Sequence, residues 1–145
     1  IAVRFIEYMD VGTTNGWSLD DVVSASEIRD MIGDIERIIP ENNSDVAKRY
    51  KLPNGGEVGI ISSVTEPFCG DCTRARISSD GRLFTCLFSN NGLDLLSPIR
   101  TGHTDSHITD LIREHWSKRQ DRYSEERSLN SSKTSERVEM SYIGG

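Results

Sequence analysis

The sequence lacks a long hydrophobic run and lacks a recognisable secretory leader. No apolar stretch approaches the roughly 18 residues that indicate a membrane-spanning helix, so we expect no membrane partner. With no signal peptide at its start, the sequence is typical of a protein of the reducing cytoplasm. Its 145 residues are enough for a domain with its own hydrophobic core.

Positive charge is also scarce. The formal net charge is −6, which argues against a general nucleic-acid-binding protein. One short stretch departs from this balance, since residues 73–82 contain three arginines and one aspartate. A small basic spot in an acidic chain suits a small phosphorylated ligand better than a polymer.

Cysteine is rare, and all three cysteines fall in one stretch. Cys69 and Cys72 have Cys-x-x-Cys spacing, and Cys86 follows a turn signal at Asp80-Gly81. A hairpin at that turn would return Cys86 to the side of the first pair. Three thiolates would then face one point.

Four kinds of site are compatible with such a set of thiols. A disulfide fits poorly, because three is an odd number and nothing indicates secretion. A structural zinc site needs a fourth ligand, for which His103 or His107 is available. A redox dithiol is a third reading. A 4Fe–4S cluster with three cysteine ligands would leave one iron open to a substrate, and the nearby arginines favour this version.

The arginines between the cysteines suggest an anion site. Arg74 and Arg76 straddle Ala75, so on a strand both side chains would leave the same face. Two guanidinium groups in that arrangement can bind phosphate oxygens in bidentate fashion. Arg82, beside the Asp-Gly turn, reads as a solvated turn residue.

Three motifs of one protein family occur here in the family's order. The first is Arg4-Phe5-Ile6-Glu7-Tyr8-Met9, and the last is Gly144-Gly145. The central motif consists of Phe68-Cys69-x-x-Cys72-x-Arg74-x-Arg76, then Asp80-Gly81, then Cys86-Leu87-Phe88. Together they span nearly the whole chain, which resembles the C-terminal portion of the MoaA family. These are the radical S-adenosylmethionine GTP cyclases that open molybdenum cofactor biosynthesis.

The resemblance implies a role for each of these residues. The implied ligands of a 4Fe–4S cluster are Cys69, Cys72 and Cys86. Its open iron would anchor the guanine of GTP, and the implied substrate-binding residues are Arg74, Ala75 and Arg76. Met9 would line the S-adenosylmethionine site. Gly144 and Gly145 would reach into the active site as catalytic residues, because glycines can enter a narrow pocket.

The resemblance also implies the reaction and a missing partner. In the family, reductive cleavage of S-adenosylmethionine yields a radical that takes hydrogen from the ribose of GTP, and a cyclised pterin precursor follows. A Cys-x3-Cys-x2-Cys motif for the family's first 4Fe–4S cluster is absent from this sequence. The expected partners are therefore GTP and an N-terminal half of the same enzyme, and a homodimer is one option. The chain is not expected to be active alone.

The expected fold class is α/β, as an α+β fragment in two parts. Residues 1–40 would be the last strand and helix of an incomplete TIM-type radical S-adenosylmethionine barrel, with Phe5 and Ile6 in its core. A capping box at Ser24 and Glu27 would begin a helix that ends at Pro40. Residues 41–145 would form the cluster-binding and GTP-binding region with a flexible Gly-Gly tail.

Turn and cap signals predict the elements of this second part. Asn54-Gly55 predicts a hairpin, and the turns together predict an antiparallel sheet of about four strands. Thr104 would cap an amphipathic helix. Residues 117–139 are dense in charge and serine and read as a flexible tail, which Tyr142 and Ile143 would anchor.

Overall fold

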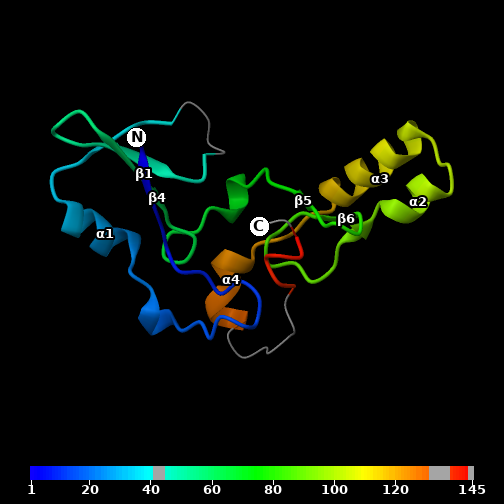
Figure 1. Cartoon of the computed structure of the whole chain (residues 1–145), viewed down its shortest axis with the longest axis horizontal. Helices are drawn as coiled ribbons and strands as arrows, with labels where there is room; N and C mark the ends of the chain where they lie inside the picture. Colours follow the sequence, from blue (N-terminus) through cyan, green and yellow to red (C-terminus); the bar gives the residue numbers. More distant parts are fainter. Residues whose placement is uncertain (41–44, 131–137, 144–145) are drawn as a thin grey trace. The chain divides into compact units, whose positions relative to one another are not determined.

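The computed structural model (Figure 1) describes residues 1–40, 45–130 and 138–143. These residues fall into two compact units. Unit 1 comprises Ile1–Asp10, Gly16–Thr73 and Ser124–Ser128, and unit 2 comprises Val11–Asn15, Arg74–Tyr123 and Leu129–Gly145. Each unit contains one sheet, and the mixture of strands and helices agrees with the predicted α+β class. Within the described ranges, no helix combines the length and the apolar character that crossing a membrane requires.

Unit 1 is built on a four-stranded sheet in the order β1-β4-β3-β2. Its strands are β1 (Val3–Ile6), β2 (Glu36–Arg37), β3 (Lys48–Lys51) and β4 (Glu57–Ile61). β3 and β4 form an antiparallel pair, as Asn54-Gly55 predicted. β1 runs parallel to β4, with Phe5 opposite Ile60. No local turn signal predicts this pairing, because its two strands are far apart in the chain.

Helix α1 (Ala25–Ile32) supplies one side of the core of unit 1 and follows a short 3-10 turn, η1 (Leu19–Asp21). It begins with the predicted capping box, in which the Ser24 N–H donates to the Glu27 carboxylate at 2.8 Å. The prediction that it runs to Pro40 is wrong. It ends at Gly33, whose φ of +86° is a conformation that stops a helix and that glycine adopts readily. The buried core residues are Ala25, Ile28, Tyr50, Val58 and Ile60.

Strand β1 exposes apolar side chains and buries an acidic one. Phe5 is 40% exposed and Ile6 is 57% exposed, so this chain by itself does not bury them, and their place in a barrel core stays a prediction. β1 is one of the two edge strands of the sheet, and among the described residues it pairs with β4 alone. The side chain of Glu7, directly after β1, is instead covered, and the residue is 2% exposed.

The buried carboxylate of Glu7 accepts hydrogen bonds from two separate segments. It accepts from the Ala25 N–H at 2.7 Å, the Val64 N–H at 2.7 Å and the Thr65 N–H at 2.9 Å. The Thr65 hydroxyl donates a fourth hydrogen bond. A carboxylate can be buried only when its oxygens are paired in this way. Glu7 therefore joins the end of β1 to the first turn of α1 and to the loop after β4.

Unit 2 is built on a three-stranded antiparallel sheet in the order β5-β6-β7. Its elements are β5 (Arg76–Ile77), β6 (Arg82–Phe84), β7 (Leu93–Asp94), α2 (Leu96–Arg100) and α3 (Asp105–Ser117). The Asp80-Gly81 turn joins β5 to β6, and Thr104 caps α3 by accepting from the His107 N–H, both as predicted. The prediction of one antiparallel sheet is wrong, because turn signals predict hairpins without specifying the sheet that each hairpin joins.

Residues 117–130 contain more structure than their composition predicts. α3 extends to Ser117, and a further helix, α4 (Tyr123–Asn130), follows. Arg127 of α4 is 8% exposed and forms an ion pair of 3.0 Å with Asp10. The prediction of a flexible tail is therefore wrong for residues 117–130. Residues 131–137 lie outside the described residues, as do residues 41–44, so the predicted domain boundary at 40/41 stays a prediction.

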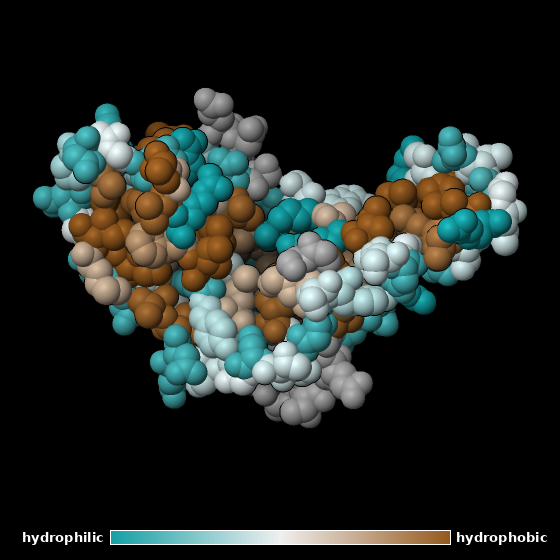
Figure 2. Space-filling view, in the orientation of Figure 1, coloured by the Kyte–Doolittle hydropathy of each residue, from teal (hydrophilic) through white to brown (hydrophobic). Residues whose placement is uncertain are grey.

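Helices α2 and α3 carry hydrophobic side chains on their surface, which Figure 2 shows in brown. The amphipathic pattern predicted for α3 is present, since Ile108 and Leu111 are half-buried. The exposed apolar residues of the two helices are Leu96, Ile99, Ile112 and Trp116.

Replacing Glu7 by glutamine in the complete protein should loosen the loop after β4. The substitution replaces one acceptor oxygen by a side-chain NH2 group. That group is a donor, and it would face backbone N–H groups that are donors too. A buried N–H without a partner costs about 1–3 kcal/mol, so hydrogen exchange at Val64 and Thr65 should accelerate about tenfold or more.

The matched control is Glu57→Gln, which removes a partly exposed carboxylate that pairs with Arg49. Such surface pairs contribute little, so exchange at the loop should stay at the wild-type rate. Equal exchange in the two variants would contradict the role given to Glu7.

Candidate functional site

The Cys-x-x-Cys pair lies on a short turn at the end of the Gly16–Thr73 segment of unit 1. Cys69 begins the 3-10 turn η2 (Cys69–Asp71), and the Cys72 N–H donates to the Cys69 carbonyl at 3.2 Å. Both residues are half-buried thiols, and neither is in a disulfide. The turn therefore holds both thiols on one short segment, as their spacing predicts.

The loop that leads into this turn is held by two carboxylates in unit 1. Glu7 binds two of its amides, as described above. Glu66 forms ion pairs with Arg29 of α1, at 2.9 Å, and with Lys48 of β3. The hydrogen bond from Lys48 keeps the pKa of Glu66 below its ordinary value, with Arg29 adding to the effect, so this carboxylate is ionised at neutral pH. The loop is thus tied to β1, α1 and β3.

Arg127 connects the same loop to the residues after β1. Its guanidinium donates to the Asp10 carboxylate at 3.0 Å and to the Ser63 carbonyl at 3.3 Å, and it lies 6.0 Å from the ring centre of Trp17. Met9, the predicted cofactor-binding residue, is half-buried and directly precedes Asp10. One side chain of α4 therefore supports both the Met9 segment and the approach to the cysteine turn.

Cys86 lies in unit 2, between two residues whose side chains contact Asp121, just before α4, and Tyr123, the first residue of α4. The Thr85 hydroxyl donates to Asp121 at 2.5 Å, and the Phe88 ring stacks on Tyr123 with ring centres 4.4 Å apart. The Phe88 N–H also lies 3.5 Å from the Cys86 Sγ, in position to donate to it. A hydrogen bond to sulfur stabilises negative charge on it, which suits a thiolate ligand.

The predicted convergence of the three cysteines stays a prediction. Cys69 and Cys72 belong to unit 1, and Cys86 belongs to unit 2. Among the residues that the structure describes, no three His, Cys, Asp or Glu side chains gather around a common ion position. The alternative zinc ligands, His103 and His107, lie with ring centres 4.6 Å apart on the surface of unit 2.

The arginines lie at the beginning of the Arg74–Tyr123 segment of unit 2, in a geometry that differs from the prediction. β5 begins at Arg76, so Arg74 and Ala75 precede the strand and both are exposed, whereas Arg76 is half-buried. The prediction of a common strand face for the two arginines is wrong, because strand alternation does not extend to Arg74. Arg82 is exposed and pairs with Asp80 at 3.4 Å, as expected of a turn residue.

The predicted catalytic residues, Gly144 and Gly145, lie outside the described residues. The two residues before them are anchored, as predicted. Ile143 is 1% exposed, and the Tyr142 hydroxyl donates to Asp80 at 2.6 Å.

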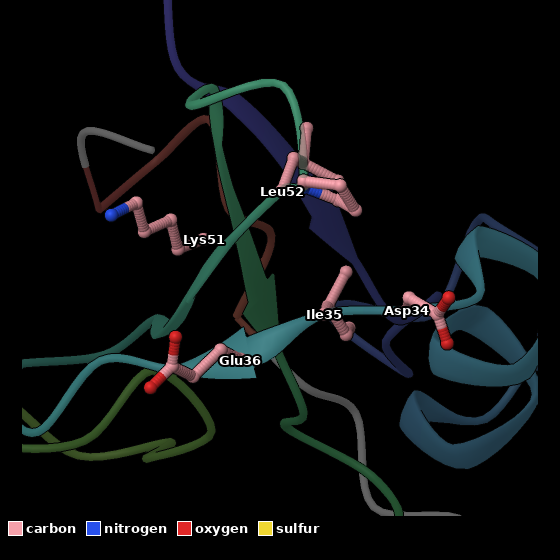
Figure 3. Close-up of a pocket in the computed structure, with 6 residues that line it drawn as sticks. Asp34, Ile35, Glu36, Lys51 and Leu52 are labelled. Carbon is pink, nitrogen blue, oxygen red and sulfur yellow. The ribbon is translucent and has the colours of Figure 1, made fainter.

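An open pocket of about 440 Å³ lies on unit 1 beside strands β2 and β3. Figure 3 shows that Asp34, Glu36 and Lys51 point away from one another around it. Two carboxylates and one lysine do not suit a phosphate ligand, and no predicted site residue lines this pocket. It is therefore not the candidate site.

The supporting residues were missed by sequence reasoning. Glu7 had a usable signal, since it is an acidic residue with the apolar or aromatic residues Phe5, Ile6, Tyr8 and Met9 on either side. No sequence signal marked Asp121, Tyr123 or Arg127 as a supporting residue. They occur in a charged stretch whose composition is typical of a solvated segment.

Comparison with known proteins identifies the family. A sequence model of the family described as Molybdenum Cofactor Synthesis C matches residues 1–125. The whole chain is 41% identical to a GTP 3′,8-cyclase of Synechococcus sp. and 46% identical to one of Staphylococcus haemolyticus. A GTP 3′,8-cyclase of Acidothermus cellulolyticus is 44% identical over 99% of the chain. The chain spans 43%, 45% and 47% of the lengths of these three relatives.

The family model covers most of the chain, and the matched relatives carry the activity of the family that the three motifs resemble. The chain belongs to the Molybdenum Cofactor Synthesis C family and corresponds to the C-terminal part of MoaA-type GTP 3′,8-cyclases.

Proposed function

We propose that this chain is the substrate-binding part of a GTP 3′,8-cyclase that acts in molybdenum cofactor synthesis. The observation that carries the proposal is the match of the whole chain to proteins of that name, at 41% and 46% identity. The stretch with three cysteines and two neighbouring arginines supports it independently. It offers thiolates for a metal cluster and guanidinium groups for phosphates on one segment of chain.

We propose that Cys69, Cys72 and Cys86 hold a 4Fe–4S cluster with one open iron. When bound, the cluster would supply a free coordination position for the guanine of GTP. The donor set suits this role. All three residues are half-buried thiols, and the Phe88 N–H lies within hydrogen-bond distance of the Cys86 sulfur. Half-burial keeps a thiolate within reach of a cluster while shielding it from bulk water.

We propose that Arg74 and Arg76 bind the triphosphate of GTP, with Ala75 between them. The exposure of Arg74 leaves its side chain room to turn towards a ligand. A guanidinium group binds two phosphate oxygens in parallel, and two such groups match the several acceptor oxygens of a triphosphate. The role of Gly144 and Gly145 as catalytic residues at the same site is part of the proposal.

The remaining parts of the activity are assigned to an N-terminal half of the same enzyme. That half would supply most of a TIM-type barrel, a second 4Fe–4S cluster and most of the S-adenosylmethionine site. Residues 1–40 would complete the barrel, and Met9 would contribute to the S-adenosylmethionine site. The chain would accordingly show no turnover by itself.

The cysteines are tested by iron content. Anaerobically reconstituted complete enzyme should bind about eight irons in two clusters, and each of Cys69→Ser, Cys72→Ser and Cys86→Ser should lose about four of them. Ser79→Ala, at an exposed position of the intervening turn, should keep the full content. Stoichiometric zinc without iron in this half would overturn the cluster and favour a structural zinc module.

The support of Cys86 is tested by the rate at which a chelator removes iron. Thr85→Val keeps the shape of the side chain but removes the hydroxyl that Asp121 accepts from. Losing a hydrogen bond to a charged group costs about 1.5–3 kcal/mol, so iron release should be about tenfold faster or more. Thr109→Val on exposed α3 is the matched control. Identical release from both variants would speak against the role of Thr85.

The arginines are tested by GTP affinity. Arg74→Ala or Arg76→Ala in the complete enzyme should weaken GTP binding by about 1.5–3 kcal/mol, the range for hydrogen bonds to charged groups. Lysine at either position should restore only part of the GTP affinity, because it lacks the planar guanidinium group that binds two oxygens at once. Iron content should not change. Arg113→Ala, which removes an exposed α3 side chain paired with Asp110, is the control. Unaltered affinity in the double alanine variant would remove the phosphate-binding role.

A further inference from the structure

The described residues at the end of unit 2 form an ordered turn. The Tyr142 N–H donates to the Glu139 carbonyl at 3.0 Å, and the Ile143 N–H donates to the Met140 carbonyl at 3.2 Å. The side chain of Ile143 belongs to the buried core of unit 2. A terminal segment without such contacts would be expected to fray.

The first contact of this turn is made by the carboxylate of Glu139 with the loop that follows Asp10. It accepts from the Thr13 N–H at 2.8 Å, the Thr13 hydroxyl at 3.2 Å and the Thr14 hydroxyl at 3.3 Å. Gly12 makes room for it, because a Cβ on Gly12 would lie 2.1 Å from a Glu139 oxygen. The φ of Gly12 is +71°, which also favours glycine. The loop is therefore shaped to receive this carboxylate.

The second contact is made by Tyr142 with the hairpin between β5 and β6. Its hydroxyl donates to the Asp80 carboxylate at 2.6 Å, and its ring packs edge-on against Phe84 with ring centres 6.2 Å apart. Asp80 is held in turn by the Ser78 hydroxyl. The hydrogen bond to Asp80 raises the pKa of Tyr142, so the phenol keeps the proton that it donates. The partner of Tyr142 is thus itself fixed in the turn.

We propose that Glu139 and Tyr142 form a two-point latch that positions Gly144 and Gly145 for the reaction. This inference rests on the proposed function, in which the two glycines act at the active site. Glycine has no side chain with which to fix its own place and loses the most conformational freedom on ordering. Because Ile143 is held in place, the point at which these two residues join the described chain is fixed.

The latch contacts two stretches of unit 2 that are close in sequence to proposed site residues. Thr13 and Thr14 closely follow Met9, and Asp80 lies between Arg76 and Cys86. The terminal segment is bound to both of these stretches within unit 2. Glu139 and Tyr142 are therefore positioning residues, which act through the segment that they hold and do not touch the reacting atoms.

The test uses the complete enzyme with Glu139→Ala, Tyr142→Phe and the double variant. Tyr142→Phe keeps the ring contact with Phe84 and removes only the hydroxyl. Amide hydrogen exchange at Tyr142 and Ile143 should rise about tenfold in each single variant and further in the double variant. Exchange at Thr13 should rise only where Glu139 is replaced. The value of kcat should fall about tenfold, while the KM for GTP and the iron content stay unchanged.

Glu114→Ala is the matched control, because Glu114 is an exposed carboxylate of α3 paired with Lys118. It should leave exchange and kcat at the wild-type values. Wild-type exchange in the double variant would overturn the latch itself. Raised exchange with wild-type kcat would overturn its role in positioning.

A separate variant that lacks Gly144 and Gly145 distinguishes failure of the latch from failure of the proposed function. Loss of turnover on this deletion, together with reduced kcat in the latch variants, supports both. Full turnover without the glycines would refute their catalytic role, and the positioning proposal would fall with it. Loss of turnover on deletion with wild-type kcat in the double variant would refute the latch alone.

Discussion

The buried carboxylate of Glu7 is the interaction on which the rest of unit 1 depends. It satisfies the first amide of α1 and two amides of the loop after β4. Without it, the buried N–H of Ala25 would lose its partner, at a cost of about 1–3 kcal/mol, and the partly buried hydrogen bonds of the Val64 and Thr65 amides would also be lost. Because β1 leads to Met9 and the loop leads to Cys69, one side chain determines the local geometry of two proposed sites.

The last part of the described chain supports these sites from the other end of the sequence. Asp121 and Tyr123 hold the segments on either side of Cys86, and Arg127 binds Asp10. A charged stretch usually has a low content of buried contacts. Here its charges are partnered by groups distant in sequence, so they are part of the folded structure.

The proposed functional residues and their supports differ in exposure for a physical reason. A ligand-binding group must reach its ligand, and the three cysteines are accordingly half-buried and Arg74 is exposed. A supporting group works only if its own position is restricted, and Glu7 and Arg127 are almost fully buried. This is the arrangement expected of a site in which buried residues, through packing and hydrogen bonds, fix the position of the residues that contact the ligand.

The sequence by itself determined several features whose partners lie a few residues apart. These features are the capping box at Ser24, the cap at Thr104, the hairpins at Asn54-Gly55 and Asp80-Gly81, and the Cys69-x-x-Cys72 turn. Its motifs also determined the family. Only the tertiary structure decided the parallel pairing of β1 with β4, the separation into two sheets, the burial of Glu7 and the pairing of Arg127 with Asp10. Each of these depends on contacts between distant segments, and such contacts leave no periodic or turn signal in the local sequence.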